Sequence, residues 1–308
     1  MNLFKLLTDL ARVDPDVYGR FDSRRRVFRH LGATGRVLTQ AALPGLLSGL
    51  FQKAYGQTAL SGEAVTVLNL ALSLEYLELY YYRMGLGAGI LSAADAVAFT
   101  AIRDDEQGHV TALRAILDTA AIPDPGAAAF DYTAGGKVQP FANTANFLAV
   151  AQAFEDLGVR AYKGGLTTLF SNKAILRAAL SIHSVEARHA AHIRTLRRGG
   201  VGVAGADGGG TNDSLPKSWV SLRDNNGPLP VLTTAIYGPG TTAASPAEDN
   251  LVQARVNVQV NSSSPSPSLA LTAAAASEAF DEPLDTQQVR AIAVQFVAAG
   301  NSQGLFIK

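Results

Sequence analysis

The stretch ALSLEYLELYYY (residues 71–82) places one acid, Glu75, on an otherwise apolar helix face. Leu68, Leu72 and Leu79 share this face, because they precede or follow Glu75 at helical spacing. A carboxylate on such a face is costly to remove from water unless a positive charge meets it. The stretch therefore predicts a buried helix whose acid has a cationic partner.

The same arrangement returns 80 residues later in FLAVAQAFEDLGVRAY (147–162), where Glu155 takes the place of Glu75. Each acid is followed 31 residues on by a Glu-x-x-His motif. These motifs are Glu106-x-x-His109 and Glu186-x-x-His189. The offset of 80 also relates Leu68 to Leu148, Ala71 to Ala151, Leu86 to Leu166, and Arg114 to Arg194. One helical hairpin is therefore present twice, and each copy carries one Glu and one Glu-x-x-His.

Cap and stop signals predict four helices, at Ser61–Met84, Ser92–Asp118, Thr144–Leu166 and Asn172–Arg198. The short link after the first helix makes the first two antiparallel neighbours. A link of 22 residues rich in Pro and Gly (122–143) joins the two hairpins. It is long enough to cross from one end of a bundle to the other. The expected fold is an all-α four-helix bundle with one long crossover, in a domain over residues 61–200.

The two motifs and the two single acids predict a metal site. In Glu-x-x-His both side chains fall on one helix face and can bind the same ion. A Glu from each of two helices with a Glu-x-x-His from each of the other two is the ligand set of dinuclear four-helix bundles. Four carboxylates would repel without metal, whereas two divalent cations offset their charge. The predicted ligands of two metal ions are Glu75, Glu106, His109, Glu155, Glu186 and His189.

Within this set, the acids of the motifs, Glu106 and Glu186, are expected to bridge the ions, and the two single acids to bind one ion each. No catalytic side chain is expected beyond the ligands. Tyr82 and Tyr162 lie seven residues after the single acids. They are predicted either to donate hydrogen bonds to the site or to have their hydroxyls satisfied elsewhere in the core.

Nearby polar residues compete for these roles. Glu78 could replace Glu75 by a rotation of the first helix, but its repeat partner is Gly158, so the symmetry of the repeat argues against it. Supporting or solvent-facing positions are expected for the remaining acids and histidines near the motifs, which are Asp104, Asp105, Asp156, His183 and His192.

Composition excludes several other classes of site. The 26 basic and 26 acidic residues cancel, which gives no electrostatic basis for binding nucleic acid. Without cysteine the chain has no disulfide, thiolate metal site or Cys nucleophile. No apolar run reaches the roughly 18 residues of a membrane-spanning helix. Hydrophobic residues make up 47% of the 308, enough for a sizeable core.

Residues 1–60 allow two interpretations. SRRRVFRH (23–30), followed by the apolar run AALPGLLSGLF (41–51), has the outline of a twin-arginine export signal, which would place the mature protein in the periplasm or outside the cell. The alternative is a retained basic and apolar helix that packs on the main domain, in a cytoplasmic protein.

Residues 201–308 are predicted to be a linker and an irregular extension. The pattern indicates little strand, with one candidate at 251–260, and two short helices at 273–280 and 285–299. The second helix is amphipathic through Val289, Ile292, Ala293 and Phe296. We expect this extension to wrap the bundle or to form a homo-oligomer contact.

Four stretches resemble the ferritin-like superfamily and, within it, the bacterial desiccation-related ferritin-like domain proteins. They are LNLALSLEYLELYYY (68–82), DDEQGHVTALRAIL (104–117), FLAVAQAFEDLGVRAY (147–162) and SVEARHAAHIRTLRR (184–198). ASEAFDEPLDTQQVRAIA (276–293) also resembles the C-terminus of that group. The ligand order is shared by ferritins, rubrerythrins, manganese catalases and oxygenases, so the resemblance implies a site more than one reaction. Members of the desiccation-related group are often exported.

Oxygen and imidazole ligands favour iron or manganese, and we expect iron ahead of manganese. The leading hypothesis is an oxidoreductase that acts on O2 or hydrogen peroxide, as a ferroxidase or a manganese catalase does, in protection against oxidative or drying stress. The alternative is a structural stress protein whose metal only braces the helices. A third hypothesis, hydrocarbon oxygenation, requires an apolar substrate channel.

Overall fold

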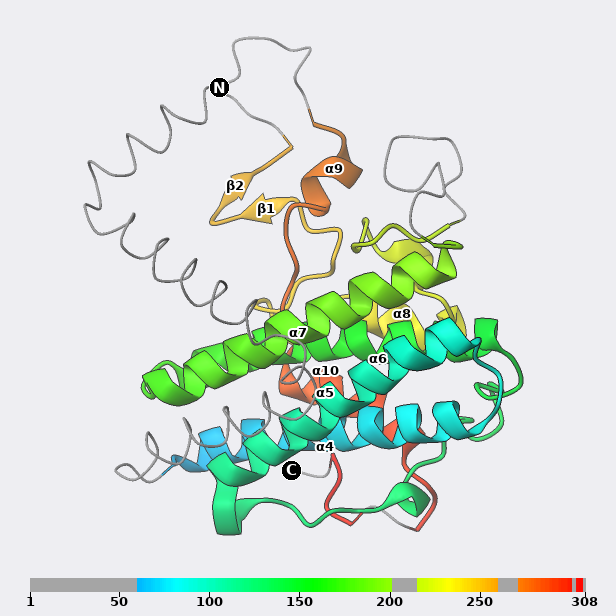
Figure 1. Cartoon of the computed structure of the whole chain (residues 1–308). Coiled ribbons are helices and arrows are strands. Elements are labelled where there is room, and N and C mark those ends of the chain that lie inside the picture. Colours follow the sequence, from blue (N-terminus) through cyan, green and yellow to red (C-terminus); the bar gives the residue numbers. More distant parts are fainter. Residues whose placement is uncertain (1–59, 201–214, 260–270, 301–302, 307–308) are drawn as a thin grey trace, which may run out of the picture. The chain divides into compact units, whose positions relative to one another are not determined.

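Four long helices run side by side at the centre of the computed structural model (Figure 1). They are α4 (Gly62–Gly87), α5 (Ala93–Leu117), α6 (Thr144–Gly165) and α7 (Lys173–Arg197). α4 packs against α5 and α6 against α7 as two hairpins, and contacts of α4 with α6 and of α5 with α7 join them. The all-α bundle with one long crossover is therefore confirmed.

The structure describes residues 60–200, 215–259, 271–300 and 303–306. All of them belong to the unit Leu47–Lys308. The arginine-rich stretch at 23–30, the apolar run at 41–51 and the linker at 201–214 lie outside the described residues.

Polar caps begin the helices where the sequence predicts. Ser61 Oγ accepts a hydrogen bond from the backbone N of Ala64 at 3.2 Å, and Ser92 Oγ accepts one from Asp95 N at 3.1 Å. Asn143 Oδ1 caps α6 in the same way. α4 continues three residues beyond the predicted end, to Gly87, because the glycines fit within its last turn.

The crossover between the hairpins is tied to both α4 and the C-terminal segment. It contains the 3-10 turns η1 (Asp118–Ala120) and η2 (Ala127–Ala129). The Tyr132 hydroxyl donates to the Leu77 carbonyl at 2.7 Å, which attaches the crossover to α4. Asp131 N donates to Phe296 O, and Ala298 N to Ala129 O, both at 2.9 Å. The long link is thus a structural part of the bundle wall.

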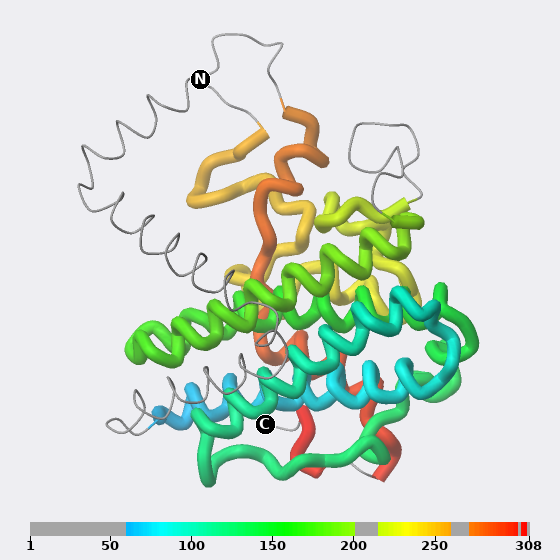
Figure 2. Tube along the Cα trace, viewed as in Figure 1, coloured from blue at the N-terminus to red at the C-terminus, as the bar shows by residue number. Residues whose placement is uncertain are grey.

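The C-terminal segment adds three short helices in its described part, α8 (Pro230–Tyr237), α9 (Ala273–Ser277) and α10 (Thr286–Ala293), the last continued by the 3-10 turn η6 (Val294–Phe296). α10 contacts α4, α6 and α8, and Figure 2 lets the reader follow its orange to red trace beside the bundle. The predicted apolar face of α10 is confirmed, because Val289, Ile292, Ala293 and Phe296 are all buried.

Two predictions for this segment are wrong in detail. The strand predicted at 251–260 is a small hairpin of β1 (Val252–Gln253) and β2 (Val256–Asn257), turned at Ala254 and Arg255 with φ of 49° and 70°. The helix α8 was not predicted, because its β-branched sequence PVLTTAIY favours extended structure. Burial of Leu232, Ile236 and Tyr237 overrides that preference.

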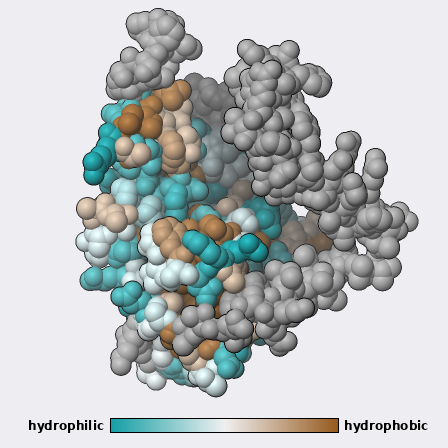
Figure 3. Space-filling model, turned by 90° about the vertical axis from the view of Figure 1, so that its left-hand side faces the viewer, coloured by the Kyte–Doolittle hydropathy of each residue, from teal (hydrophilic) through white to brown (hydrophobic). Residues whose placement is uncertain are grey.

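The surface that Figure 3 shows mixes hydrophilic residues with scattered hydrophobic ones. In the described part of the chain, no helix has the length and hydropathy needed to cross a membrane.

Arg160 of α6 holds the C-terminal segment on the bundle. Its guanidinium donates to the carbonyl oxygens of Glu282 at 2.9 Å, Gly238 at 2.9 Å, Pro246 at 2.6 Å and Pro283 at 3.1 Å, and also to that of Ile236. Its Nε lies 2.9 Å from Glu248 Oε1, and both side chains are buried. Next to it, a Cβ on Gly164 would lie 2.0 Å from the Leu284 carbonyl, so only glycine permits this approach.

Replacing Arg160 with Ala should lower the free energy of unfolding by about 3–5 kcal/mol, because it leaves the buried Glu248 carboxylate without its cation. Urea unfolding followed by circular dichroism measures this. The control is Arg223→Ala, whose exposed pair with Asp249 at 2.8 Å should contribute about 0–1 kcal/mol. Equal losses in the two variants would refute the role of Arg160.

Candidate metal centre

The six predicted ligands meet at the centre of the bundle, and each lies on the helix that the sequence predicts for it. Glu75 comes from α4, Glu155 from α6, and one Glu-x-x-His from each of α5 and α7. The four carboxylates have 0% exposure, and both imidazoles have 5%. The residues form two groups in which one ligand atom from each member lies within 4.8 Å of the others. The groups are Glu75, Glu106, His109 and Glu186, and Glu106, Glu155, Glu186 and His189.

In the first group, three carboxylate oxygens surround one ring nitrogen. His109 Nδ1 lies 3.0 Å from Glu75 Oε2, 2.9 Å from Glu106 Oε2 and 2.9 Å from Glu186 Oε1. One Nδ1 carries at most one proton and cannot donate fully to three acceptors. The donor atoms are therefore grouped as ligands around a shared cation would be.

The second group repeats this pattern around His189. Its Nδ1 lies 2.9 Å from Glu106 Oε1, 3.4 Å from Glu155 Oε2 and 3.6 Å from Glu186 Oε2. These contacts lack hydrogen-bond geometry, since the ring nitrogen and the three oxygens have no hydrogen-bond partner among the described residues. Buried polar atoms without partners are rare in proteins, and a bound ion is one explanation for them.

Glu106 and Glu186 belong to both groups, and each divides its two oxygens between them. Glu106 turns Oε2 toward His109 and Oε1 toward His189. Glu186 turns Oε1 toward His109 and Oε2 toward His189. This geometry suits carboxylates that bridge two ions, which is the role that we predict for them from sequence.

Two tyrosines link the hairpins through the single acids. The Tyr82 hydroxyl of α4 donates to Glu155 Oε1 on α6, and the Tyr162 hydroxyl of α6 donates to Glu75 Oε1 on α4. Burial raises the pKa of both hydroxyls, so they remain proton donors. Each tyrosine thus orients one oxygen of an acid and leaves the other oxygen directed at the imidazole.

Without metal, two of the acids and both histidines of the centre keep their protons to a higher pH than the same side chains do in water. Burial raises the pKa of Glu75 from 4.5 to about 8, with a further contribution from Glu186. Burial also raises the pKa of Glu155. For both histidines burial acts the other way, but the surrounding carboxylates prevail and raise the pKa.

The structure corrects how some neighbouring residues were interpreted. Asp156 neither faces solvent nor contacts the centre; it is buried, and Arg194 bonds to its two oxygens at 3.2 and 2.5 Å. The hydroxyl of its repeat partner, Tyr76, accepts a hydrogen bond from Arg114 Nη1 at 2.7 Å. In both hairpins an arginine therefore bonds to the side chain at this position. The shared offset of Arg114 and Arg194 was the sequence signal for it.

Asp105 and Glu78 are nearer to the centre. Asp105 Oδ2 lies 3.2 Å from His189 Nε2 and orients that ring, which is the supporting position expected for it. Glu78 is 1% exposed, although the symmetry of the repeat argues against a role for it. The periodicity of α4 does not reveal its burial, because α4 is enclosed on nearly all sides.

Residues 63–198 match the family model described as a ferritin-like domain. This range covers nearly all of the four long helices and all six predicted ligands. The match supports the resemblance of this part of the chain to the ferritin-like superfamily. Neither the curated proteins nor the solved structures include a match to the chain.

The metal-free protein should lose stability as the pH rises. Glu75 keeps its proton in the native state up to about pH 8, whereas the unfolded chain releases it near 4.5. The unfolded state therefore binds fewer protons in this interval, and the free energy of unfolding falls by about 1.4 kcal/mol per pH unit for each such proton. The raised pKa of both histidines gives the same sign above pH 6.5.

Urea unfolding with a chelator between pH 6.5 and 8 measures this slope. Glu75→Gln should reduce the slope by about 1.4 kcal/mol per pH unit, which is the contribution of one proton. Asp104→Asn, at a half-exposed position, should leave the slope unchanged. Saturating Mn²⁺ should remove the loss, because bound cations replace the protons. Stability that increases with pH in the chelated protein would contradict the assignment.

Proposed function

We propose that the ferritin-like domain of residues 63–198 holds two iron or manganese ions and reacts with O2 or hydrogen peroxide. The observation that carries this proposal is the pair of four-residue groups that share Glu106 and Glu186. The proposed ligands are the six residues of those groups. Iron is favoured over manganese, and the proposed role is protection against oxidative or drying stress.

The chemistry of the donors supports this choice of metal. Carboxylate oxygen and imidazole nitrogen suit iron and manganese, and the four carboxylates match the charge of two divalent ions. The oxygens of Glu186 without hydrogen-bond partners among the described residues are further support. Two adjacent redox ions supply a two-electron exchange with a small oxidant.

As a ferroxidase, the centre would let O2 take one electron from each of two Fe(II) ions and two protons from its surroundings, which yields H2O2 and two Fe(III) ions. With manganese, two H2O2 would yield two H2O and one O2. The residues of the chain have two roles here. Tyr82 and Tyr162 fix the carboxylates of Glu155 and Glu75, and the surrounding apolar side chains exclude bulk water.

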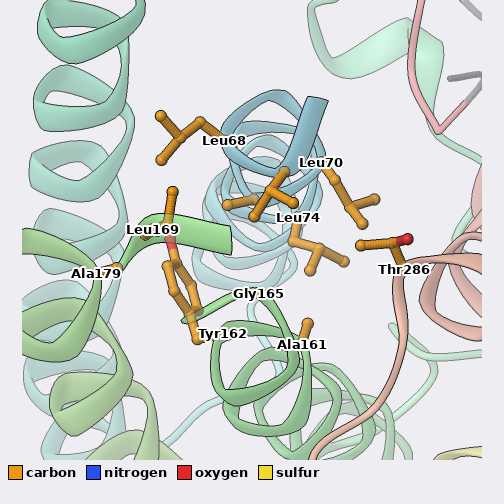
Figure 4. Close-up of a pocket in the computed structure, with 11 residues that line it drawn as sticks. Leu68, Leu70, Leu74, Ala161, Tyr162, Gly165, Leu169, Ala179 and Thr286 are labelled. Atoms are coloured by element: carbon orange, nitrogen blue, oxygen red, sulfur yellow. The ribbon is translucent and has the colours of Figure 1, made fainter. Parts of the chain in front are cut away.

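A small apolar cavity supports a small substrate. Figure 4 shows it between α4, α6 and η3 (Leu166–Leu169), with Tyr162 in its wall. Its volume is about 20 Å³, and most of its lining side chains are apolar. A single water needs about 10–15 Å³, so the cavity has room for one molecule of about that size. None of the six proposed ligands lines the cavity, but Tyr162 lines it and donates a hydrogen bond from its hydroxyl to Glu75.

The alternative is a centre that only braces the helices. Bridging ligands from α5 and α7 would join the two hairpins in that case too, and metal would raise the melting temperature without turnover.

Stopped-flow absorbance distinguishes the two functions. Metal-free protein given two equivalents of Fe(II) and then mixed with O2 should form ferric product, and Glu106→Ala should slow this about 100-fold, because both groups lose a ligand. Glu63→Ala, at an exposed position in the first turn of α4, is the control. Fe(II) that raises the melting temperature while the ferric signal stays at the rate of free iron would support bracing.

Filling the cavity should slow the reaction with O2 but spare the reaction with peroxide, which is polar and poorly suited to an apolar space. Ala71→Leu, in the cavity wall, should reduce the O2 rate several-fold. Ala115→Leu makes the same change on an exposed face of α5 and should leave both rates unchanged. Equal slowing by Ala71→Leu of the O2 and peroxide reactions would remove the cavity from the proposal.

A further inference from the structure

Glu78 is a buried acid that the six-ligand centre does not use. It lies one turn after Glu75 on α4 and is 1% exposed. Its Oε1 is buried and has no hydrogen-bond partner among the described residues. A carboxylate oxygen removed from water without a partner is costly, and such a group in a native core calls for an explanation.

The repeat partner of Glu78 is the residue that makes room for it. Gly158 of α6 faces Glu78 across the bundle, because a Cβ on this glycine would lie 3.4 Å from Glu78 Oε1. The same Cβ would lie 3.7 Å from Glu186 Cγ. A single methyl group at Gly158 would make ordinary van der Waals contacts, whereas a longer side chain would extend toward the space that Glu78 and Glu186 occupy. The loss of symmetry at this position therefore allows the extra acid.

Glu78 lies on the side of the second group. A Cβ on Gly158 would lie 3.4 Å from Glu78 Oε1 and 4.0 Å from Glu186 Oε2, which is the oxygen turned toward His189, and Tyr82, one turn after Glu78, donates to Glu155 of the second group. His189 of this group also contacts Asp105, whereas the repeat partner of Asp105 is Val185, which cannot act in this way. Two acids outside the symmetric set thus lie near the same end of the centre.

We propose that Glu78 serves the ion held by Glu106, Glu155, Glu186 and His189, and that this ion is bound more tightly than its neighbour. The proposal rests on the two-ion centre proposed above. The extra negative charge attracts a cation at this position more strongly than at the other, where the repeat has glycine. Glu78 lies outside both four-residue groups, so its unpartnered Oε1 would act on the ion through a water molecule.

Co²⁺ titration of the metal-free protein tests this, with calorimetry as the readout. His109→Ala weakens the first group and His189→Ala the second, so each background reports mainly on one ion. Glu78→Gln, which keeps the shape and removes the charge, should weaken Co²⁺ binding about 10- to 100-fold in the His109→Ala background. In the His189→Ala background it should change the affinity less than about threefold, within the range of an indirect effect.

Glu248→Gln is the matched control. Glu248 is also a buried acid with an unpartnered oxygen among the described residues, but it pairs with Arg160 outside both groups. Its replacement should leave the Co²⁺ affinity unchanged in both backgrounds. Where a double variant does not fold, Glu78→Gln alone in the full chain gives the answer. Wild type should bind Co²⁺ in a tight and a weak step, and Glu78→Gln should weaken only the tight step.

The outcomes separate this inference from the proposed function. A wild-type chain that binds no Co²⁺ would refute the metal centre itself. Two bound ions with equal affinity in wild type, an unchanged tight step in Glu78→Gln, or a loss confined to the His189→Ala background would overturn the role of Glu78 and leave the centre intact.

Discussion

Four carboxylates buried within one small volume are the constraint on which this protein depends. Each of them has 0% exposure, and like charges at such distances repel strongly where water cannot screen them. Positive charge must enter with them, as protons on the acids and imidazoles or as metal ions. Apolar side chains of similar volume would stabilise the core at least as well as these buried acids. Their presence at the centre of the bundle therefore argues for a function that needs them.

The rest of the bundle holds these groups in place. The apolar faces of α4 and α6 surround Glu75 and Glu155, and tyrosines bonded across the hairpins set the orientation of both acids. Outside this layer, the Arg160 guanidinium donates hydrogen bonds to backbone carbonyl oxygens of the C-terminal segment and so holds that segment on the bundle. A site built on helices, with its ligands oriented by further hydrogen bonds, keeps its geometry more closely than one on loops.

The duplication explains the regularity of the centre, and Glu78 and Asp105 are departures from that symmetry. Equivalent helices contribute equivalent ligands, so the two groups have the same composition. Glu78 and Gly158 are equivalent positions of the repeat that face each other, and a long side chain at Gly158 would extend toward Glu78. The repeat is unequal at this position, and the proposed difference between the two ions rests on that.

Much of the fold could be predicted from local sequence signals. The caps at Ser61 and Ser92 and the apolar spacing of α10 are local properties, and they appear in the structure where the sequence predicts them. α8 and the hairpin of β1 and β2 were not readable, because their form depends on what they pack against. For the same reason, the burial of Glu78 could not be inferred from a helix that is enclosed on nearly all sides.

The sequence by itself determined the four helices, their arrangement as two copies of one hairpin, and the six residues that the copies bring to equivalent positions. Helical periodicity and the offset of 80 residues suffice for this, since both are properties of the chain alone. Only the tertiary structure decided which oxygen of each bridging acid faces which histidine, and which unpaired acid fits beside them. These depend on distances between helices far apart in the chain, and such distances follow from side-chain volumes that meet only after folding.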